Sequence, residues 1–119
     1  MDALASQRAE VLRGTLEMLA LTLLSDGPMH GWGISVRLRE MSRDVFDVNQ
    51  GSLYPALQAM RRRGWIKAEW GPSENNRRAR FYELTAVGRR QLVEETRDWW
   101  KYAEAIAKVL RATAKPAAV

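Results

Sequence analysis

Residues able to read a nucleic-acid duplex recur at helical spacing near the middle of the chain. Tyr54, Gln58 and Arg61 lie at positions i, i+4 and i+7, on a side away from the apolar residues Leu53 and Leu57. Glutamine can pair with an adenine edge, arginine with guanine or phosphate, and a tyrosine hydroxyl with phosphate. We expect this stripe to face outward and to enter a major groove.

Neighbouring polar and basic residues extend this candidate face. Gln50 and Ser52 lie toward the N-terminal end of the same segment, where helix N–H groups and the helix dipole favour phosphate. Taken singly they have a simpler interpretation, as helix caps, just as Tyr54 can rest on a neighbour and the arginines can be solvated surface. The residues predicted to contact DNA are Gln50, Ser52, Tyr54, Gln58, Arg61, Arg62, Asn76, Arg77, Arg78 and Arg80.

The distribution of charge favours a polyanionic partner. The chain has a formal net charge of +5 and a pI near 10.1. Residues 50–90 hold nine basic side chains against three acidic ones, whereas the rest of the chain is close to neutral. The excess positive charge therefore coincides with the predicted reading segment and the polar stretch that follows it, as expected of a nucleic-acid-binding face.

Other kinds of chemistry have little support in the sequence. The chain has no cysteine and one histidine, His30, which argues against disulfides, thiolate zinc sites and other metal centres. Phosphate-cradling glycine motifs are absent, and a hydrolytic enzyme would rest on His30 alone, with no nucleophile or carboxylate nominated beside it. No stretch reaches the roughly 18 apolar residues of a membrane span. We therefore expect a cytoplasmic protein that is not an enzyme and uses no cofactor.

Apolar periodicity predicts the elements that position these residues. Leu12, Leu16, Leu19 and Leu23 have helical spacing, and the turn residues at 26–28 then stop the pattern. Aromatic and β-branched residues on either side of a polar stretch predict a hairpin with an extended tip at 71–78. Further helices are expected at 31–41, from about 51 to 63, and at 86–111, with strands at 65–70 and 80–85.

The last predicted helix is longer than a small domain needs for itself. At about 1.5 Å per residue it would extend about 40 Å, and its apolar residues follow a heptad-like seam. We expect it to pair with a second copy of the chain, assisted by the first helix; the alternative is that it only packs on the first helix of its own chain. The predicted dimer interface is Leu16, Ala20, Leu92, Thr96, Trp99, Trp100, Ala103, Ile106, Ala107 and Leu110.

Several strings in the central part of the chain resemble one family of bacterial regulators. They are Gly-Pro-Met-His-Gly-Trp-Gly-Ile at 27–34, Gln-Gly-Ser-Leu-Tyr-Pro-Ala-Leu at 50–57, Gly-Trp-Ile at 64–66 and Arg-Phe-Tyr-Glu-Leu-Thr-Ala-Val-Gly at 80–88. In this order they are similar to the PadR family of transcriptional regulators. Trp32 stands where members commonly have tyrosine, which leaves the role of that aromatic open.

The resemblance implies a winged helix-turn-helix domain, homodimerisation through the terminal helices, and repression of a nearby operon that a small effector relieves. By matching position, the recognition helix is 52–63, its characteristic tyrosine is Tyr54, and the wing is 71–80. In some relatives aromatic residues of the last helix line a pocket at the dimer centre, so Trp99 and Trp100 are candidates for a site that takes a small apolar effector.

Together these observations predict a mainly α fold with a small β-hairpin (α+β). We expect a winged helix-turn-helix DNA-binding domain at 1–85, a C-terminal dimerisation helix at 86–112 and a flexible tail at 113–119. The predicted function is that of a dimeric, sequence-specific transcriptional regulator with a double-stranded DNA operator as its partner. The alternative is a dimer that binds a small molecule or a protein and has a vestigial wing.

Overall fold

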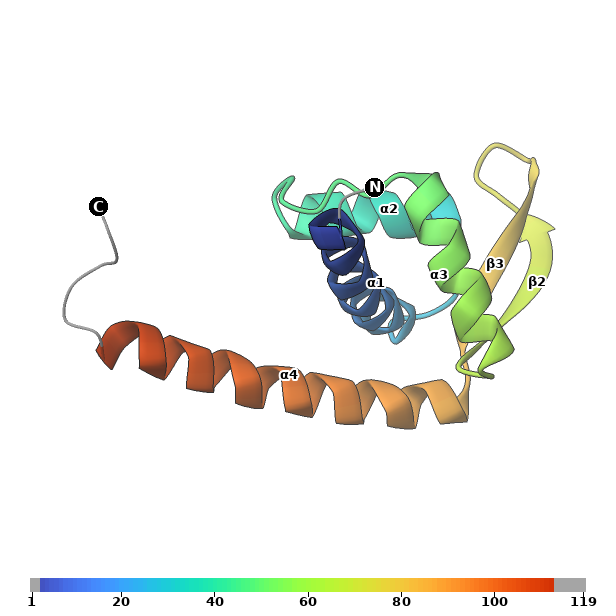
Figure 1. Ribbon diagram of the computed structural model, residues 1–119. Coiled ribbons are helices and arrows are strands. Elements are labelled where there is room, and N and C mark those ends of the chain that lie inside the picture. Colours follow the sequence, from blue (N-terminus) through green and yellow to red (C-terminus); the bar gives the residue numbers. More distant parts are fainter. Residues whose placement is uncertain (1–2, 113–119) are drawn as a thin grey trace.

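A computed structural model describes the backbone of residues 3–112 and the side chains from residue 14 onward (Figure 1). The fold is mainly α-helical with one small antiparallel sheet, which confirms the predicted fold class; the predicted tail at 113–119 lies outside the described residues. The elements are α1 (Ala3–Leu24), β1 (Met29–His30), α2 (Gly31–Met41), α3 (Gln50–Arg62), β2 (Ile66–Pro72), β3 (Arg78–Leu84) and α4 (Ala86–Ala112).

The core lies where α1, α2 and α3 converge on one face of the sheet. Leu21, Ile34 and Leu53, one from each helix, are fully buried there, and Ile66 and Tyr82 close the core from the sheet. Each fully buried aliphatic side chain contributes about 1.5–3 kcal/mol through removal of apolar surface from water. This shared core fixes α3 against the other helices, so the polar side of α3 is held in a defined direction.

The sheet has three strands rather than the two that the sequence predicts. Its order is β1-β3-β2, and the short strand β1 pairs with β3 through Met29 opposite Tyr82 and His30 opposite Phe81. A strand of two residues is too short to produce an alternating pattern, so the sequence gives no signal for it. The long strands also extend further than predicted, which shortens the tip of the wing to residues 73–77.

The long helix α4 begins next to the C-terminal end of α3 and runs away from the sheet (Figure 1). Its first half packs against α1, where Leu92 adjoins the core. Its second half projects beyond the helical domain and makes the molecule 56 Å long but only about 30 Å wide. Among the described residues, packing against α1 therefore covers only the first half of α4. No helix within residues 3–112 is long and apolar enough to span a membrane.

Candidate nucleic-acid interface

The helix that carries the predicted reading residues begins one turn before its proline. Asn49 caps α3: its Oδ1 accepts a hydrogen bond from the backbone N–H of Ser52 at 2.9 Å. The alternative in which Gln50 or Ser52 caps this helix is therefore wrong. At the other end, Arg63 closes the last turn and Gly64 reverses the chain with φ of +77°, a conformation that favours glycine.

The polar stripe of α3 does not face solvent uniformly. Tyr54 is 51% exposed, and Arg61 and Arg62 are exposed as well. Gln58 is only partly exposed, and its side-chain amide is buried beside the Tyr82 hydroxyl. The expectation that all three stripe residues face outward therefore holds for Tyr54 and Arg61, whereas Gln58 lies at the seam between α3 and the sheet.

Gln50 is engaged within the domain. Its Nε2 donates to the buried Ser35 hydroxyl at 2.7 Å and to the carbonyl oxygen of Gly31 at 3.3 Å, so one side chain of α3 bonds to both ends of the first turn of α2. The contact is close, because a β-carbon at Gly31 would lie 2.9 Å from Gln50 Oε1. In this structure Gln50 holds the angle between the two helices, a role that its position in the sequence does not reveal.

Tyr82 connects α3 to the wing. Its side chain is buried, and burial raises the pKa of its hydroxyl above the ordinary value, while the charge of Arg80 opposes that rise. Tyr54, Arg61 and Gln58 from α3 also lie close enough to influence this hydroxyl. The seam therefore brings the polar side of the helix and the basic side of β3 together around one neutral hydroxyl.

The wing carries an aromatic residue that the sequence analysis missed. Trp70 is 58% exposed and stands opposite Arg80 in the strand register. The guanidinium groups of Arg78 and Arg80 lie over its ring, at 5.4 and 5.8 Å from the centroid. Strand alternation places Trp70 on the same side of β2 as the core residue Ile66. This period of two is the sequence signal that could have identified Trp70.

The wing tip holds the remaining predicted contacts. Ser73 closes the tip, with its hydroxyl and its backbone N–H each 2.8 Å from the carbonyl oxygen of Arg77. Asn76 adopts a positive φ of 60°, and both Asn76 and Arg77 are exposed. Exposed basic side chains from α3 and from the hairpin are thus placed at opposite sides of the seam at Tyr82.

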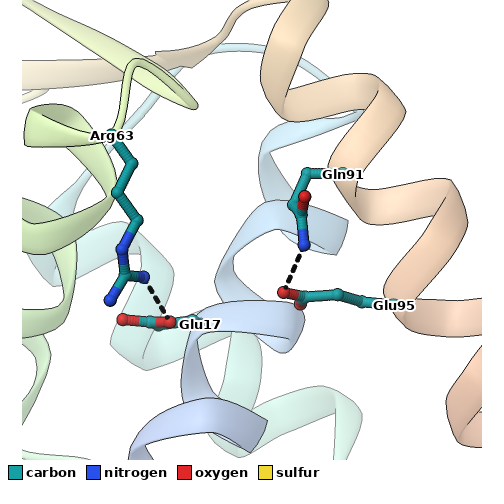
Figure 2. Close-up of polar contacts among 4 residues, drawn as sticks. All are labelled: Glu17, Arg63, Gln91 and Glu95. Carbon is teal, nitrogen blue, oxygen red and sulfur yellow. Dashed lines mark hydrogen bonds and ion pairs between the residues drawn. The ribbon is translucent and has the colours of Figure 1, made fainter.

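Two further polar residues, Arg63 and His30, have internal roles. Arg63, the last of three consecutive arginines, donates to the buried Glu17 of α1 at 2.9 Å (Figure 2). Its guanidinium group also lies 4.8 Å from the ring centroid of Trp65. His30 caps α2, with its Nδ1 accepting from the backbone N–H of Gly33 at 3.0 Å, and its ring meets Phe81 edge-on. A structural role explains His30 without hydrolytic chemistry.

The predicted dimer residues divide into two groups. Leu16 and Ala20 belong to the core of their own chain, with 8% and 0% exposure. Ala20 offers no surface to a partner, whereas Leu16 lines a cleft beside α1. Leu92 and Thr96 are partly covered, and the Thr96 hydroxyl bonds the carbonyl oxygen of Leu92. The residues from the second half of α4 are accessible: Trp99, Trp100, Ala103, Ile106, Ala107 and Leu110.

Two apolar features remain uncovered in the single chain. Trp99 and Trp100 meet edge to face with centroids 5.0 Å apart, and Trp100 borders a shallow hollow beside Ala103 and Ala107. A cleft of about 490 Å³ opens on the other side of α1, between Leu19, the loop at 45–49 and the start of α3. Both features are mainly apolar, and both lie away from the basic residues of the wing.

The chain is similar to known regulators over most of its length. The model of the transcriptional regulator PadR-like family matches residues 20–94. A PadR-like transcriptional regulator from Bacillus cereus is 26% identical, with a TM-score of 0.73 over 85% of this chain and 96% of its own. A PadR family transcriptional regulator from Eggerthella lenta is also 26% identical, with a TM-score of 0.72 over 90% of this chain and 91% of its own. An uncharacterized protein from Lysinibacillus sphaericus is 24% identical over 83% of this chain and 91% of its own length.

Proposed function

The chain belongs to the PadR-like family of transcriptional regulators, and from this premise we propose that it binds operator DNA as a homodimer and represses a nearby operon. The observation that carries the proposal is the joining of two basic elements at one seam. Exposed Arg61 on α3 and Arg80 of β3 both lie close enough to act on the Tyr82 hydroxyl, and Arg80 shares the Trp70 ring with Arg78 of the wing. This arrangement suits a helix in a major groove with a wing on the flanking backbone.

The polar residues of this face fall into two groups, those that can contact base edges and those that can contact only the DNA backbone or a minor groove. Tyr54 and Arg61 are exposed, so they can contact base edges or phosphates, and Gln58 lies at the rim of the same surface beside the Tyr82 hydroxyl. Arg77 and Arg78 supply sequence-independent charge, because exposed arginines on a short tip reach phosphates or a minor groove. Ser52 adds a hydroxyl at the helix N-terminus, where phosphate binding is favoured.

The exposed half of α4 supports dimerisation. Ile106 and Leu110 are 58% and 70% exposed on a helix that projects beyond its own domain, and Trp99 and Trp100 are accessible beside them. A second copy would cover this apolar surface with its own α4 and bring its equally apolar cleft beside α1 into reach. The DNA-binding domain then comprises residues 1–85 and the dimerisation helix residues 86–112.

The edge-to-face Trp99–Trp100 pair supports relief by a small effector. In the proposed dimer the pair lies at the interface and offers aromatic surface to a planar apolar compound. Titration of tryptophan fluorescence with such compounds tests this step. Strong quenching together with weak, salt-insensitive DNA binding would instead favour the alternative, a ligand-binding dimer with a vestigial wing.

The direct test uses paired charge removals. Arg77→Ala with Arg78→Ala should weaken binding to a selected operator and lower the slope of log K against log salt by up to about 2. Arg97→Ala with Lys101→Ala removes the same charge from exposed positions of α4, and should leave both quantities near those of the parent. Size-exclusion chromatography with light scattering on the same samples measures the oligomeric state. Parental affinity and slope in the wing variant would refute the proposed face.

A further inference from the structure

Three elements are fastened together at the C-terminal end of the recognition helix α3. Arg63 binds Glu17 on α1, and Gly64 then reverses the chain. The N–H of Trp65 donates to the carbonyl oxygen of Met60 at 3.0 Å, and the Trp65 carbonyl oxygen accepts from the backbone N–H of Thr85 at 3.0 Å. The first residues of α4 are therefore tied directly to the residues that end α3.

The Thr85 side chain strengthens this connection. Its hydroxyl donates to the carbonyl oxygens of Gly64 and Trp65, which lie 2.6 and 2.9 Å away. The Thr85 Oγ1 atom in turn accepts from the backbone N–H of Gly88 at 3.0 Å, which caps the first turn of α4. One hydroxyl thus satisfies both the turn that follows α3 and the beginning of α4.

Gly88 allows the two segments to touch. It is the buried residue of α4, and a β-carbon there would overlap the Trp65 carbonyl oxygen, lying 2.8 Å from the carbonyl carbon and 3.0 Å from Leu84 Cδ1. The obstacle is mainly backbone, so a larger residue cannot be accommodated by rotation of a side chain. Since glycine is a poor helix former, close approach is the physical reason for its place in the first turn.

We propose that Thr85 and Gly88 are positioning residues that fix the direction of α4 relative to α3, and thereby the separation of the two recognition helices in the dimer. The inference rests on the proposed function, because separation matters only if two copies bind adjacent half-sites. We call the contact between Thr85, Gly88 and the residues that follow α3 the joint. The Thr85 hydroxyl holds the joint together by hydrogen bonds, and Gly88 sets how closely the two segments approach each other. Neither residue contacts DNA in this proposal.

The length of α4 makes the joint sensitive. A β-carbon at residue 88 would have to retreat by about 1.5 Å to reach ordinary contact with the Trp65 carbonyl oxygen, and at about 4.5 Å from Thr85 this corresponds to a tilt of about 18°. Some 30 Å further along α4, among the exposed apolar residues, the tilt becomes a displacement of about 10 Å. Base pairs are separated by about 3.4 Å, so the displacement equals about three steps along the duplex.

The experiment compares Thr85→Val and Gly88→Ala with Thr85→Ser, which retains the hydroxyl. Because the chain has no cysteine, Arg62→Cys places a single spin label on each recognition helix, and electron–electron resonance then measures the label separation in the dimer without DNA. Half-sites selected from a random duplex pool with the parent are then re-spaced in steps of one base pair, and affinity is measured for each spacing.

We expect Thr85→Ser to match the parent in both measurements. Thr85→Val should broaden the distance distribution, and Gly88→Ala should shift its centre by roughly 5 Å or more. The preferred half-site spacing should change by at least one base pair, with about a tenfold loss on the parental operator. Parental distances and spacing in folded, dimeric Thr85→Val would overturn the inference, and that variant decides alone if Gly88→Ala does not fold. A parent that binds no DNA would refute the proposed function, while the label distances would still test the joint.

Discussion

The ion pair between Glu17 and Arg63 predicts an asymmetric response to removing either partner. The Glu17 side chain is 8% exposed, its Oε1 lies 2.9 Å from Arg63 Nη1, and its Oε2 is buried without another partner in the described part of the chain. Arg63→Met keeps an apolar stem near Trp65 but leaves this carboxylate without its cation. Breaking a buried pair in this way costs about 3–5 kcal/mol.

The expected cost here is lower, because the Arg63 side chain is 47% exposed and water screens part of the interaction. We expect Arg63→Met to lower the free energy of unfolding by about 2 kcal/mol. Glu17→Met removes the buried charge and fills a similar volume, so it should cost less than about 1 kcal/mol. Arg62→Met makes the same change at an exposed neighbouring residue and should stay within about 0.5 kcal/mol of the parent.

Urea unfolding followed by far-ultraviolet circular dichroism, at one fixed protein concentration, measures the free energy of unfolding of these three variants. The same measurement is made on the double variant that combines Glu17→Met with Arg63→Met. The fixed concentration matters because dimerisation stabilises the folded state by mass action. In the double variant the penalty of Arg63→Met should largely disappear, since no unpaired carboxylate remains. The reasoning fails if Arg63→Met unfolds with the parent, or if Glu17→Met costs as much as Arg63→Met.

Two other substitutions test the Gln50 contact between α2 and α3 and the buried hydroxyl of Tyr82. Gln50→Ala leaves the buried Ser35 hydroxyl without its partner, so it should lower the free energy of unfolding by about 1 kcal/mol. It should also reduce affinity for the selected operator more than for random DNA, and equal losses on both, by fluorescence anisotropy, would contradict a role in holding the helix angle. Burial raises the pKa of Tyr82, so its neutral hydroxyl favours the folded state below about pH 10 and this contribution is lost as the pH rises through the folded-state value. Tyr82→Phe should therefore show a weaker loss of stability with rising pH above about 10 than the parent, as measured by urea unfolding at several pH values.

The sequence predicts the helices and the hairpin because their signals are local. Apolar spacing identified α1, α2 and α4, and the turn residues around the wing identified the hairpin that joins β2 to β3. The two-residue strand β1 is too short to show such a period. Its partners in β3 lie some fifty residues away in the sequence. Local patterns do not encode that kind of pairing.

The candidate site was harder to predict because polar residue types do not reveal their partners. Gln50 looks like a DNA contact, yet its amide bonds α2; Arg63 looks like its two neighbours, yet it binds a carboxylate forty-six residues away. Leu16 and Ala20 belong to an apolar stripe that suits either a partner or the chain's own core, and only the packed structure places them in that core. Trp70 was recognisable as part of a strand but not as a ring beneath two arginines.

The pairing of β1 with β3 has a consequence for engineering this scaffold. His30 belongs to the sheet through Phe81 and to α2 through its cap on Gly33, so β3, the central strand of the sheet, also sets how α2 begins. Hairpins exchanged between relatives at 66–84 alone would arrive without the segment that docks them. A chimaera that also transfers residues 29–33 should keep its thermal stability, whereas the shorter graft should lose it.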